Sequence, residues 1–249
     1  MCGIGGFVDY EHDARRYAAA AKRMQRSLTP RGPDAEGDYQ DADAVLVHRR
    51  LIVIDPDGGM QPMYAPDGNT VLVYNGELYN TEEIRKDLLA RGHTFRGHSD
   101  TEVLLHAFLE WDTDAFERLN GIFAFAIWQK KERRLVLCRD RLGVKPLFVA
   151  RLQNGIVFGS TIGAVLCHPA VEPEVDEDGL RAVLLLGPAR PPASGVFRQI
   201  DSLLPGHYAD LTPEGYADRT YWKLEAHEHP DDLETTIART HELICDAAQ

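Results

Sequence analysis

The sequence predicts an α+β protein in which two antiparallel sheets stack face to face and helices cover their outer faces. Two patterns carry this prediction. Short strand-like segments follow one another in pairs joined by tight turns, which is typical of antiparallel sheets, and amphipathic helical segments flank these pairs. The 249 residues provide enough chain for one large or two small domains with a sizeable core.

The strand predictions rest on apolar and β-branched segments that end at turn residues. They cover residues 3–9, 44–47, 51–54, 70–74, 122–128, 135–139, 146–150 and 156–159, with a last hairpin between 205 and 222. The charged segment 129–133 and the Asn154-Gly155 pair are hairpin turns in this interpretation. Asn75-Gly76 is placed at the exposed end of the strand 70–74.

Helical periodicity predicts helices at residues 15–28, 81–90, 102–111, 160–166 and 231–249. A loop with two prolines and a glycine ends the first of them. Thr81 is predicted to cap the second, with Glu82 and Glu83 in its first turn, where carboxylates suit the helix dipole. The proline-rich segment 188–195 is predicted as a loop.

Composition excludes several classes of partner. The formal net charge of -12 opposes binding to nucleic acid or to an anionic membrane surface. The longest apolar segments, such as 121–128, are far shorter than the roughly 20 residues that span a bilayer. No secretory signal is recognised at the N-terminus, so a cytoplasmic protein is expected. The scattered cysteines favour reduced thiols and no structural zinc.

Cys2 is the first candidate for catalysis. If an aminopeptidase removes Met1, Cys2 carries a thiol and a free α-amine, so nucleophile and base lie on one residue. The apolar strand that follows would hold this terminus in place. Taken alone, the first five residues favour an ordinary small buried cysteine, because short motifs have a high false-positive rate.

Five further residues can complete a site around Cys2. Asn75-Gly76 offers a side-chain amide and a backbone N–H as donors to an oxyanion, although the pair is also typical of a hairpin turn. Arg50 is suited to clamp a carboxylate, and Asp100 with Glu77 to hold an ammonium group. Taken singly, Arg50 is typical of a surface ion pair and Asp100 of a helix N-cap; the grouping points to an amino-acid substrate.

Six ordered motifs then carry a resemblance to a known family. They are residues 1–4 (Met-Cys-Gly-Ile), 31–34 (Arg-Gly-Pro-Asp), 48–51 (His-Arg-Arg-Leu), 74–80 (Tyr-Asn-Gly-Glu-Leu-Tyr-Asn), 99–102 (Ser-Asp-Thr-Glu) and 139–147 (Arg-Asp-Arg-Leu-Gly-Val-Lys-Pro-Leu). Together they resemble the glutaminase domain of glutamine-hydrolysing asparagine synthetases, which are class II glutamine amidotransferases. The resemblance covers about residues 2–222.

The resemblance implies a four-layer αββα sandwich of the N-terminal nucleophile (Ntn) hydrolase type. It also implies hydrolysis of L-glutamine to L-glutamate and ammonia through a γ-glutamyl thioester. Carried over by position, the catalytic residues would be Cys2 as nucleophile and base, with Asn75 and Gly76 as the oxyanion hole. The substrate-binding residues would be Arg50, the backbone near Val53, Glu77 and Asp100.

The family's second domain begins with a Ser-Gly-Gly-Leu-Asp-Ser-type pyrophosphate loop, and this sequence contains none. Residues 1–222 are therefore expected to form the glutaminase domain, and 223–249 a linker and the start of a truncated C-terminal synthetase domain. ATP and Mg are expected only for that missing domain, which would amidate aspartate. No metal or organic cofactor is expected in this chain, since His227-Glu228-His229 lacks a third ligand.

Two other functions stay open on the sequence. The ammonia could serve a different acceptor, such as a peptide or a natural-product acid, because the acceptor is bound elsewhere. A non-catalytic module that binds glutamine or regulates a partner would be favoured if Met1 is retained. The expected partners are L-glutamine and the synthetase domain, without nucleic acid or membrane, and a homodimer is compatible with the sequence.

Overall fold

The computed structural model describes residues 1–52, 59–187 and 191–247. Its strands form two six-stranded antiparallel sheets within these residues. The first sheet has the order β10-β8-β9-β1-β3-β2, with β1 Gly3–Asp9, β2 Ala35–Gln40, β3 Ala44–Arg50, β8 Phe148–Leu152, β9 Gly155–Gly159 and β10 Asp201–Ser202. The second has the order β12-β11-β7-β6-β5-β4, with β4 Met63–Tyr64, β5 Thr70–Leu78, β6 Gly121–Gln129, β7 Arg134–Arg139, β11 His207–Thr212 and β12 Gly215–Thr220.

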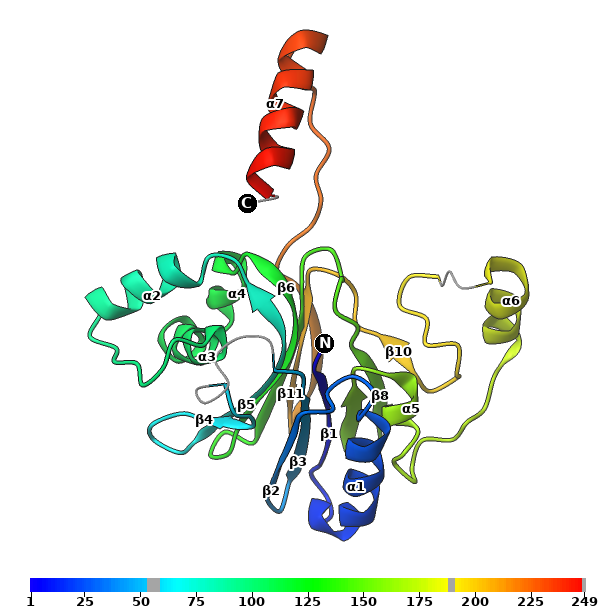
Figure 1. Cartoon of the computed structure of the whole chain (residues 1–249). Helices are drawn as coiled ribbons and strands as arrows, with labels where there is room; N and C mark the ends of the chain where they lie inside the picture. Colours follow the sequence, from blue (N-terminus) through cyan, green and yellow to red (C-terminus); the bar gives the residue numbers. More distant parts are fainter. Residues whose placement is uncertain (53–58, 188–190, 248–249) are drawn as a thin grey trace.

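Helices lie on the outer sides of the two sheets (Figure 1). Those next to the first sheet are η1 Ala14–Tyr17, α1 Ala18–Ser27 and α5 Ile162–Val165. Those next to the second are α2 Thr81–Ala90, α3 Asp100–Trp111, η2 Asp112–Asp114 and α4 Ala115–Arg118. Two further helices, α6 Glu177–Leu186 and α7 Leu233–Ala247, stand apart from the sandwich in this view.

The side-chain alternation of β6 shows how the layers are held together. Phe123 and Phe125 belong to the apolar cluster between the second sheet and its helices. Ala124 and Ala126, on the opposite face, belong to the cluster between the two sheets. Because successive strand residues point to opposite faces, the strand is buried on both sides. A third cluster, which includes Phe7 and Met24, fills the space between the first sheet and α1. The predicted αββα sandwich is confirmed.

The N-terminus of the chain is held by a strand in the interior of its sheet. β1 pairs with β3 on one side, where Gly3 is opposite Arg49, and with β9 on the other. Beyond the end of β9, Ser160 continues the contact: the Ile4 N–H donates to Ser160 Oγ at 3.0 Å, and the Ser160 N–H donates to the Ile4 carbonyl at 2.8 Å. Cys2 therefore projects from a fixed strand instead of a frayed end.

Several predicted boundaries were wrong. The sequence predicted that the strand beginning at residue 44 ends at residue 47. β3 instead continues to Arg50, because its pairing with β1 extends to Arg49 and its pairing with β2 extends to Arg50. Leu51 and Ile52 are not in a strand, and the rest of the predicted strand 51–54 and most of the turn 57–59 lie outside the described residues. β2, a polar strand at the sheet edge, and α6 were not predicted at all.

The N-terminus of α2 also differs from the prediction. Thr81 is the first helical residue instead of the cap, and the cap position is Asn80. The Thr81 hydroxyl donates to the Leu78 carbonyl at 2.7 Å, so it joins the helix to the end of β5. Asn80 accepts from the Asn120 N–H at 2.9 Å and is used to hold the neighbouring strand.

Replacing Ser160 with Ala tests the anchoring of β1. The change leaves the Ile4 N–H buried without its acceptor, so the free energy of unfolding should fall by about 1–3 kcal/mol. Urea unfolding followed by circular dichroism measures the loss. The matched control is Ser27→Ala on the exposed side of α1, which should change stability by no more than about 0.5 kcal/mol. Equal stabilities of the two variants would contradict the anchoring role.

Candidate active site

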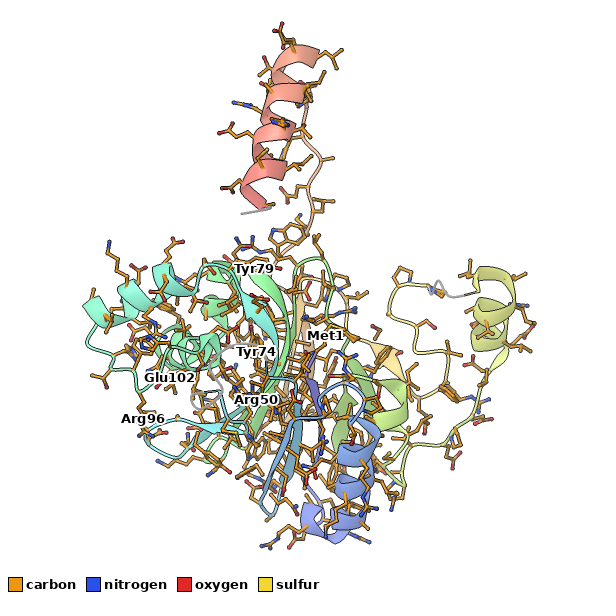
Figure 2. The ribbon with its side chains drawn as sticks, viewed as in Figure 1. Met1, Arg50, Tyr74, Tyr79, Arg96 and Glu102 are labelled. Atoms are coloured by element: carbon orange, nitrogen blue, oxygen red, sulfur yellow. The ribbon has the colours of Figure 1, made fainter. Side chains whose placement is uncertain are left out.

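One cavity of about 270 Å³ opens where β1, β3, β5 and α3 meet. It is lined by residues from six segments of the chain: Met1, Cys2, Arg50, Leu51, Gly59, Gln61, Tyr74, Asn75, Gly76, Glu77, Ser99, Asp100, Thr101 and Lys145. Figure 2 shows Met1, Arg50 and Tyr74 near the centre of the molecule. Six of the seven residues that the sequence selected for the site line this cavity. The seventh, Val53, lies outside the described residues.

Cys2 is held by backbone contacts on two sides. The Leu51 N–H donates to Cys2 Sγ at 3.4 Å, and Sγ lies 3.7 Å from the Leu51 carbonyl oxygen. On the other side, Arg31 Nε donates to the Cys2 carbonyl at 3.0 Å. The thiol is half-buried and borders the cavity, so it is accessible to a ligand there.

Asn75 supplies an unpaired donor next to this thiol. Its side chain is 1% exposed, and its amide nitrogen has no hydrogen-bond partner within the described residues. A buried donor left unpaired costs about 1–3 kcal/mol, so an acceptor that enters the cavity would be bound favourably. The sequence predicted an exposed strand end at this position; that was wrong, because β5 pairs with β6 as far as Leu78.

The N–H groups of β5 that face away from β6 point to this cavity or its walls. The Tyr74 N–H donates to the Gln61 side chain at 2.6 Å, and the Leu78 N–H donates to Asp100 Oδ2 at 3.2 Å. The Gly76 N–H lies between them on the same edge, since alternate N–H groups of a strand point the same way. Gly76 is required here because a Cβ would lie 2.6 Å from the Ile122 carbonyl oxygen and 2.7 Å from the Tyr74 ring.

The cavity is lined by charged side chains of both signs. Arg50 is 4% exposed at the end of β3, and its Nη1 lies 3.7 Å from Met60 Sδ. Glu77 and Asp100 line the cavity from β5 and from the start of α3. The cap of α3 is Ser99, which accepts from the Glu102 N–H, so Asp100 is not the N-cap that its position alone suggested. The cavity thus offers a cation for a carboxylate and carboxylates for an ammonium group.

Tyr74 fixes the orientation of Asp100. Its hydroxyl donates to Asp100 Oδ2 at 2.8 Å. Burial, together with the charge of Asp100, raises the pKa of Tyr74 well above its usual value. The phenol is therefore protonated and acts as the hydrogen-bond donor that orients the Asp100 carboxyl group.

His48 joins the two sheets beneath the cavity. Its Nε2–H donates to the Tyr74 carbonyl at 3.2 Å, so it links β3 of one sheet to β5 of the other. Burial lowers the pKa of His48 to about 4, an effect that the nearby Arg50 charge reinforces. The imidazole is therefore neutral at physiological pH.

Sequence reasoning missed the parts played by three residues. Arg31 and Lys145 lie in two of the six ordered motifs, but the sequence alone indicates no role for either. Gln61 was not selected at all; its Oε1 accepts from Tyr74 and its Nε2 lies 3.5 Å from Thr101 Oγ1, which connects β5 to α3. No local pattern identifies such a residue, because its partners are 13 and 40 positions away.

Residues 1–52, 59–187 and 191–247 contain no group of three or more His, Cys, Asp or Glu side chains placed to hold a metal ion. The expectation of a metal-free site stays a prediction. In the same ranges, no helix combines the length and the apolar character that crossing a bilayer requires.

The fold is shared with two solved structures. One is a glutamine phosphoribosylpyrophosphate amidotransferase from B. subtilis, with a TM-score of 0.56 and 16% identity over 89% of this chain and 49% of that chain. The other is an allosteric regulatory enzyme of purine biosynthesis, with a TM-score of 0.59 and 18% identity over the same shares. At these identities the likeness shows the fold alone, which is the Ntn hydrolase fold of class II amidotransferases.

The chain belongs to the glutamine amidotransferase domain family, whose model matches residues 1–222. It is 43% identical over 250 residues to glutamine-hydrolyzing asparagine synthetase 3 of Bacillus subtilis, covering 99% of this chain and 41% of that protein. It is 31% identical over 264 residues to asparagine synthetase 2 of the same organism, covering 99% of this chain and 35% of that protein. The chain therefore spans about two fifths of the length of the curated relatives that it matches along its whole length.

His48 gives a test of the link between the sheets. Its pKa is about 4 in the folded chain and near 6.5 when unfolded, so the unfolded state binds more protons between these values. The His48 contribution is complete above pH 6.5 and is lost as pH falls toward 4, at about 1.4 kcal/mol per pH unit. Denaturant unfolding at several pH values should show this slope.

The variant His48→Gln retains a donor for the Tyr74 carbonyl but does not titrate, so its stability should depend less on pH between 6.5 and 4. The control is His12→Gln at an exposed position, which should keep the slope of the unaltered protein. An unchanged slope in His48→Gln would refute the assignment.

Proposed function

We propose that the cavity around Cys2 hydrolyses L-glutamine to L-glutamate and ammonia. The observation that carries the proposal is the unpaired amide of Asn75 in the cavity that Cys2 lines, together with side chains of both charges in the same lining, as an α-amino acid requires. Membership of the glutamine amidotransferase domain family supports glutamine as the substrate.

Recognition of glutamine uses the charged side chains that line the cavity. Arg50 binds the α-carboxylate, and its guanidinium geometry suits a bidentate contact. Glu77 and Asp100 bind the α-ammonium, with Asp100 oriented by the Tyr74 hydroxyl. The backbone near Val53 completes the clamp in this proposal. The side-chain amide of glutamine then reaches toward Cys2 and Asn75 at the other part of the cavity.

Chemistry begins once Met1 has been removed. The Cys2 α-amine accepts the thiol proton while Sγ forms a bond to the amide carbon of glutamine. The carbonyl electron pair moves to the oxygen, which receives hydrogen bonds from Asn75 Nδ2 and the Gly76 N–H. When the intermediate collapses, the C–N bond breaks, nitrogen takes the proton from the α-ammonium, and ammonia leaves behind a γ-glutamyl thioester.

The second half of the reaction regenerates the thiol. Water attacks the thioester carbon and gives one proton to the α-amine, and the same two donors again stabilise the oxyanion. The C–S bond then breaks, and Sγ recovers the proton. The balance is one glutamine and one water consumed for one glutamate and one ammonia released, without a metal or an organic cofactor in this chain.

The ammonia is proposed to serve the ATP-dependent amidation of aspartate, because the relatives that match the whole chain are asparagine synthetases. That reaction, with its ATP and Mg, would use parts of those proteins that this chain does not cover. The same proposal includes a glutaminase domain at residues 1–222 and, at residues 223–249, a linker with the start of the synthetase domain. It also includes cytoplasmic localisation and a homodimer. There are two alternatives: an amidotransferase that uses a different acceptor acid, and a module that binds glutamine without turnover.

Intact mass measurement with 6-diazo-5-oxo-L-norleucine tests the function. This glutamine analogue alkylates the nucleophile only where a glutamine pocket is formed. We expect a protein without Met1 that gains a single adduct on Cys2. A chain that retains Met1, or that loses Met1 and stays unlabelled, would favour the binding module instead.

The variant Cys2→Ala should lose glutaminase activity below detection, because it removes the thiol that forms the thioester and keeps only the α-amine. It should still bind glutamine, since Arg50, Glu77 and Asp100 are unchanged. An ammonia-release assay and isothermal titration calorimetry measure the two properties. Cys167→Ala, which removes a half-buried thiol outside the cavity, is the matched control and should keep full activity. Turnover by Cys2→Ala would refute the mechanism.

The variant Asn75→Ala should reduce kcat by about 10²–10³ with a smaller change in KM, because its donor acts mainly on the oxyanion of the transition state. Steady-state kinetics with glutamine measures both constants. Asn154→Ala, in the hairpin between β8 and β9, serves as the control with unchanged kinetics. A large rise in KM with unchanged kcat would instead assign Asn75 to substrate binding.

A further inference from the structure

Lys145 is a buried cation in the Cys2 cavity that the proposed clamp for glutamine does not use. Its side chain lines the cavity, and the residue is only 8% exposed. Among the described residues no ion pair of Lys145 is found, and its Nζ is not one of the buried polar atoms left without a partner, so the ammonium group reaches the open space of the cavity. A negative charge that forms in the cavity can therefore pair with it.

The loop that carries Lys145 is held by a buried carboxylate. Asp140 is 0% exposed and accepts hydrogen bonds from four backbone N–H groups. Its Oδ1 accepts from Leu142 at 3.2 Å and Val144 at 2.9 Å. Its Oδ2 accepts from Phe123 at 3.2 Å and from Lys145 itself at 2.9 Å. The Asp140 side chain is therefore used to fold the loop and is not available as the counter-ion of Lys145.

Arg139 holds the same loop from its other side. Its guanidinium donates to the Lys145 carbonyl at 2.8 Å and to the Gly143 carbonyl at 2.7 Å. It also donates to the Leu203 carbonyl at 2.6 Å, which attaches the loop to the segment after β10. Gly143 has φ +67°, a conformation that favours glycine, so the turn between the two charged anchors is specified by sequence.

The loop presents its side chains in opposite directions. Leu142 and Val144 are 71% and 51% exposed, whereas Lys145 is buried against the cavity. In the segment 142–147, Leu147 is buried as an apolar residue ordinarily is, but the one cation of the segment is buried too while Leu142 and Val144 face solvent. Neither the proposed clamp nor the oxyanion donors account for this arrangement. The motif at residues 139–147 is explained if its purpose is to place an ammonium group in the cavity.

We infer that Lys145 stabilises the negative charge that develops on Cys2 Sγ and on the amide oxygen during thioester formation and hydrolysis. The inference rests on the proposed function, in which Cys2 is the nucleophile. Arg50, Glu77 and Asp100 are committed to the ends of the amino acid, and Asn75 and Gly76 supply neutral donors. Lys145 adds a cationic side chain to the lining of the same cavity, on a loop that Asp140 and Arg139 hold in place.

Thiol alkylation with reagents of different charge tests the inference without glutamine. Iodoacetate is an anion and iodoacetamide is neutral, and both alkylate thiols, so the ratio of their rates at Cys2 reports the local charge. Peptide mass spectrometry resolves Cys2 from the exposed Cys245, which provides an internal reference. In Lys145→Met the ratio at Cys2 should fall about fivefold to tenfold, while the ratio at Cys245 stays constant.

Two further variants serve as comparisons. Lys145→Arg retains the positive charge and should keep most of the ratio. Lys86→Met removes one positive charge from the exposed side of α2, and its ratio should equal that of the unaltered protein. In glutamine turnover, Lys145→Met should lower kcat at least tenfold with KM changed by no more than about twofold.

The possible outcomes separate the two proposals. An unchanged ratio and kcat in Lys145→Met would overturn the inference, and a raised KM with unchanged kcat would assign Lys145 to carboxylate binding instead. If Lys145→Met fails to fold, the ratio of alkylation rates is measured in Lys145→Gln, which keeps a polar end group but carries no charge. The same fall in the ratio at Cys2 is expected. Failure of 6-diazo-5-oxo-L-norleucine to label the unaltered protein would refute the glutaminase proposal, whereas the reagent ratio would still decide whether Lys145 acts on the Cys2 sulfur.

Discussion

The pairing of β1 in the interior of its sheet is the constraint on which the rest of the structure depends. An N-terminal residue normally frays, but Gly3 pairs with Arg49 and Ile4 exchanges hydrogen bonds with Ser160. This arrangement brings Cys2 beside the end of β3, where Leu51 contacts its sulfur and Arg50 enters the same cavity. Apolar packing between the sheets then holds β5 opposite, so the thiol and its potential oxyanion donors become neighbours.

A second requirement is an open strand edge beside the thiol. β4 pairs only with Leu72 and Val71, which leaves the later part of β5 without a neighbouring strand on that side. Such an edge exposes unpaired N–H groups that other chains could recruit. Here Gln61 and Asp100 accept two of them, and the cavity opens at the third, from Gly76. The edge is thus protected by side chains and left open only where the proposed reaction needs a donor.

Electrostatic asymmetry in the cavity follows from what each charged side chain already holds. Tyr74 keeps Asp100 in place, and the buried His48 beneath it is neutral, so it adds no positive charge near Arg50. Asp140 and Arg139 are occupied with the backbone of their loop, which leaves Lys145 as the group from that motif that borders the cavity. Residues of one motif therefore have different physical tasks. Arg139 and Asp140 hold the backbone of the loop, and Lys145 lines the cavity.

Local sequence determined the layers of the fold and the identity of most site residues. Alternation of large and small residues along β6 specifies two buried faces, and ordered motifs identified Cys2, Asn75 and Asp100 as members of one site. Tertiary structure alone decided that Asn75 lies inside a strand with its amide unpaired, that Ser99 and not Asp100 caps α3, and that Gln61 and Lys145 border the cavity. The physical reason is that burial and hydrogen-bond partnership are set by residues tens of positions away. A sequence pattern can show which groups are present, but only the packed chain shows which of them are left without a partner.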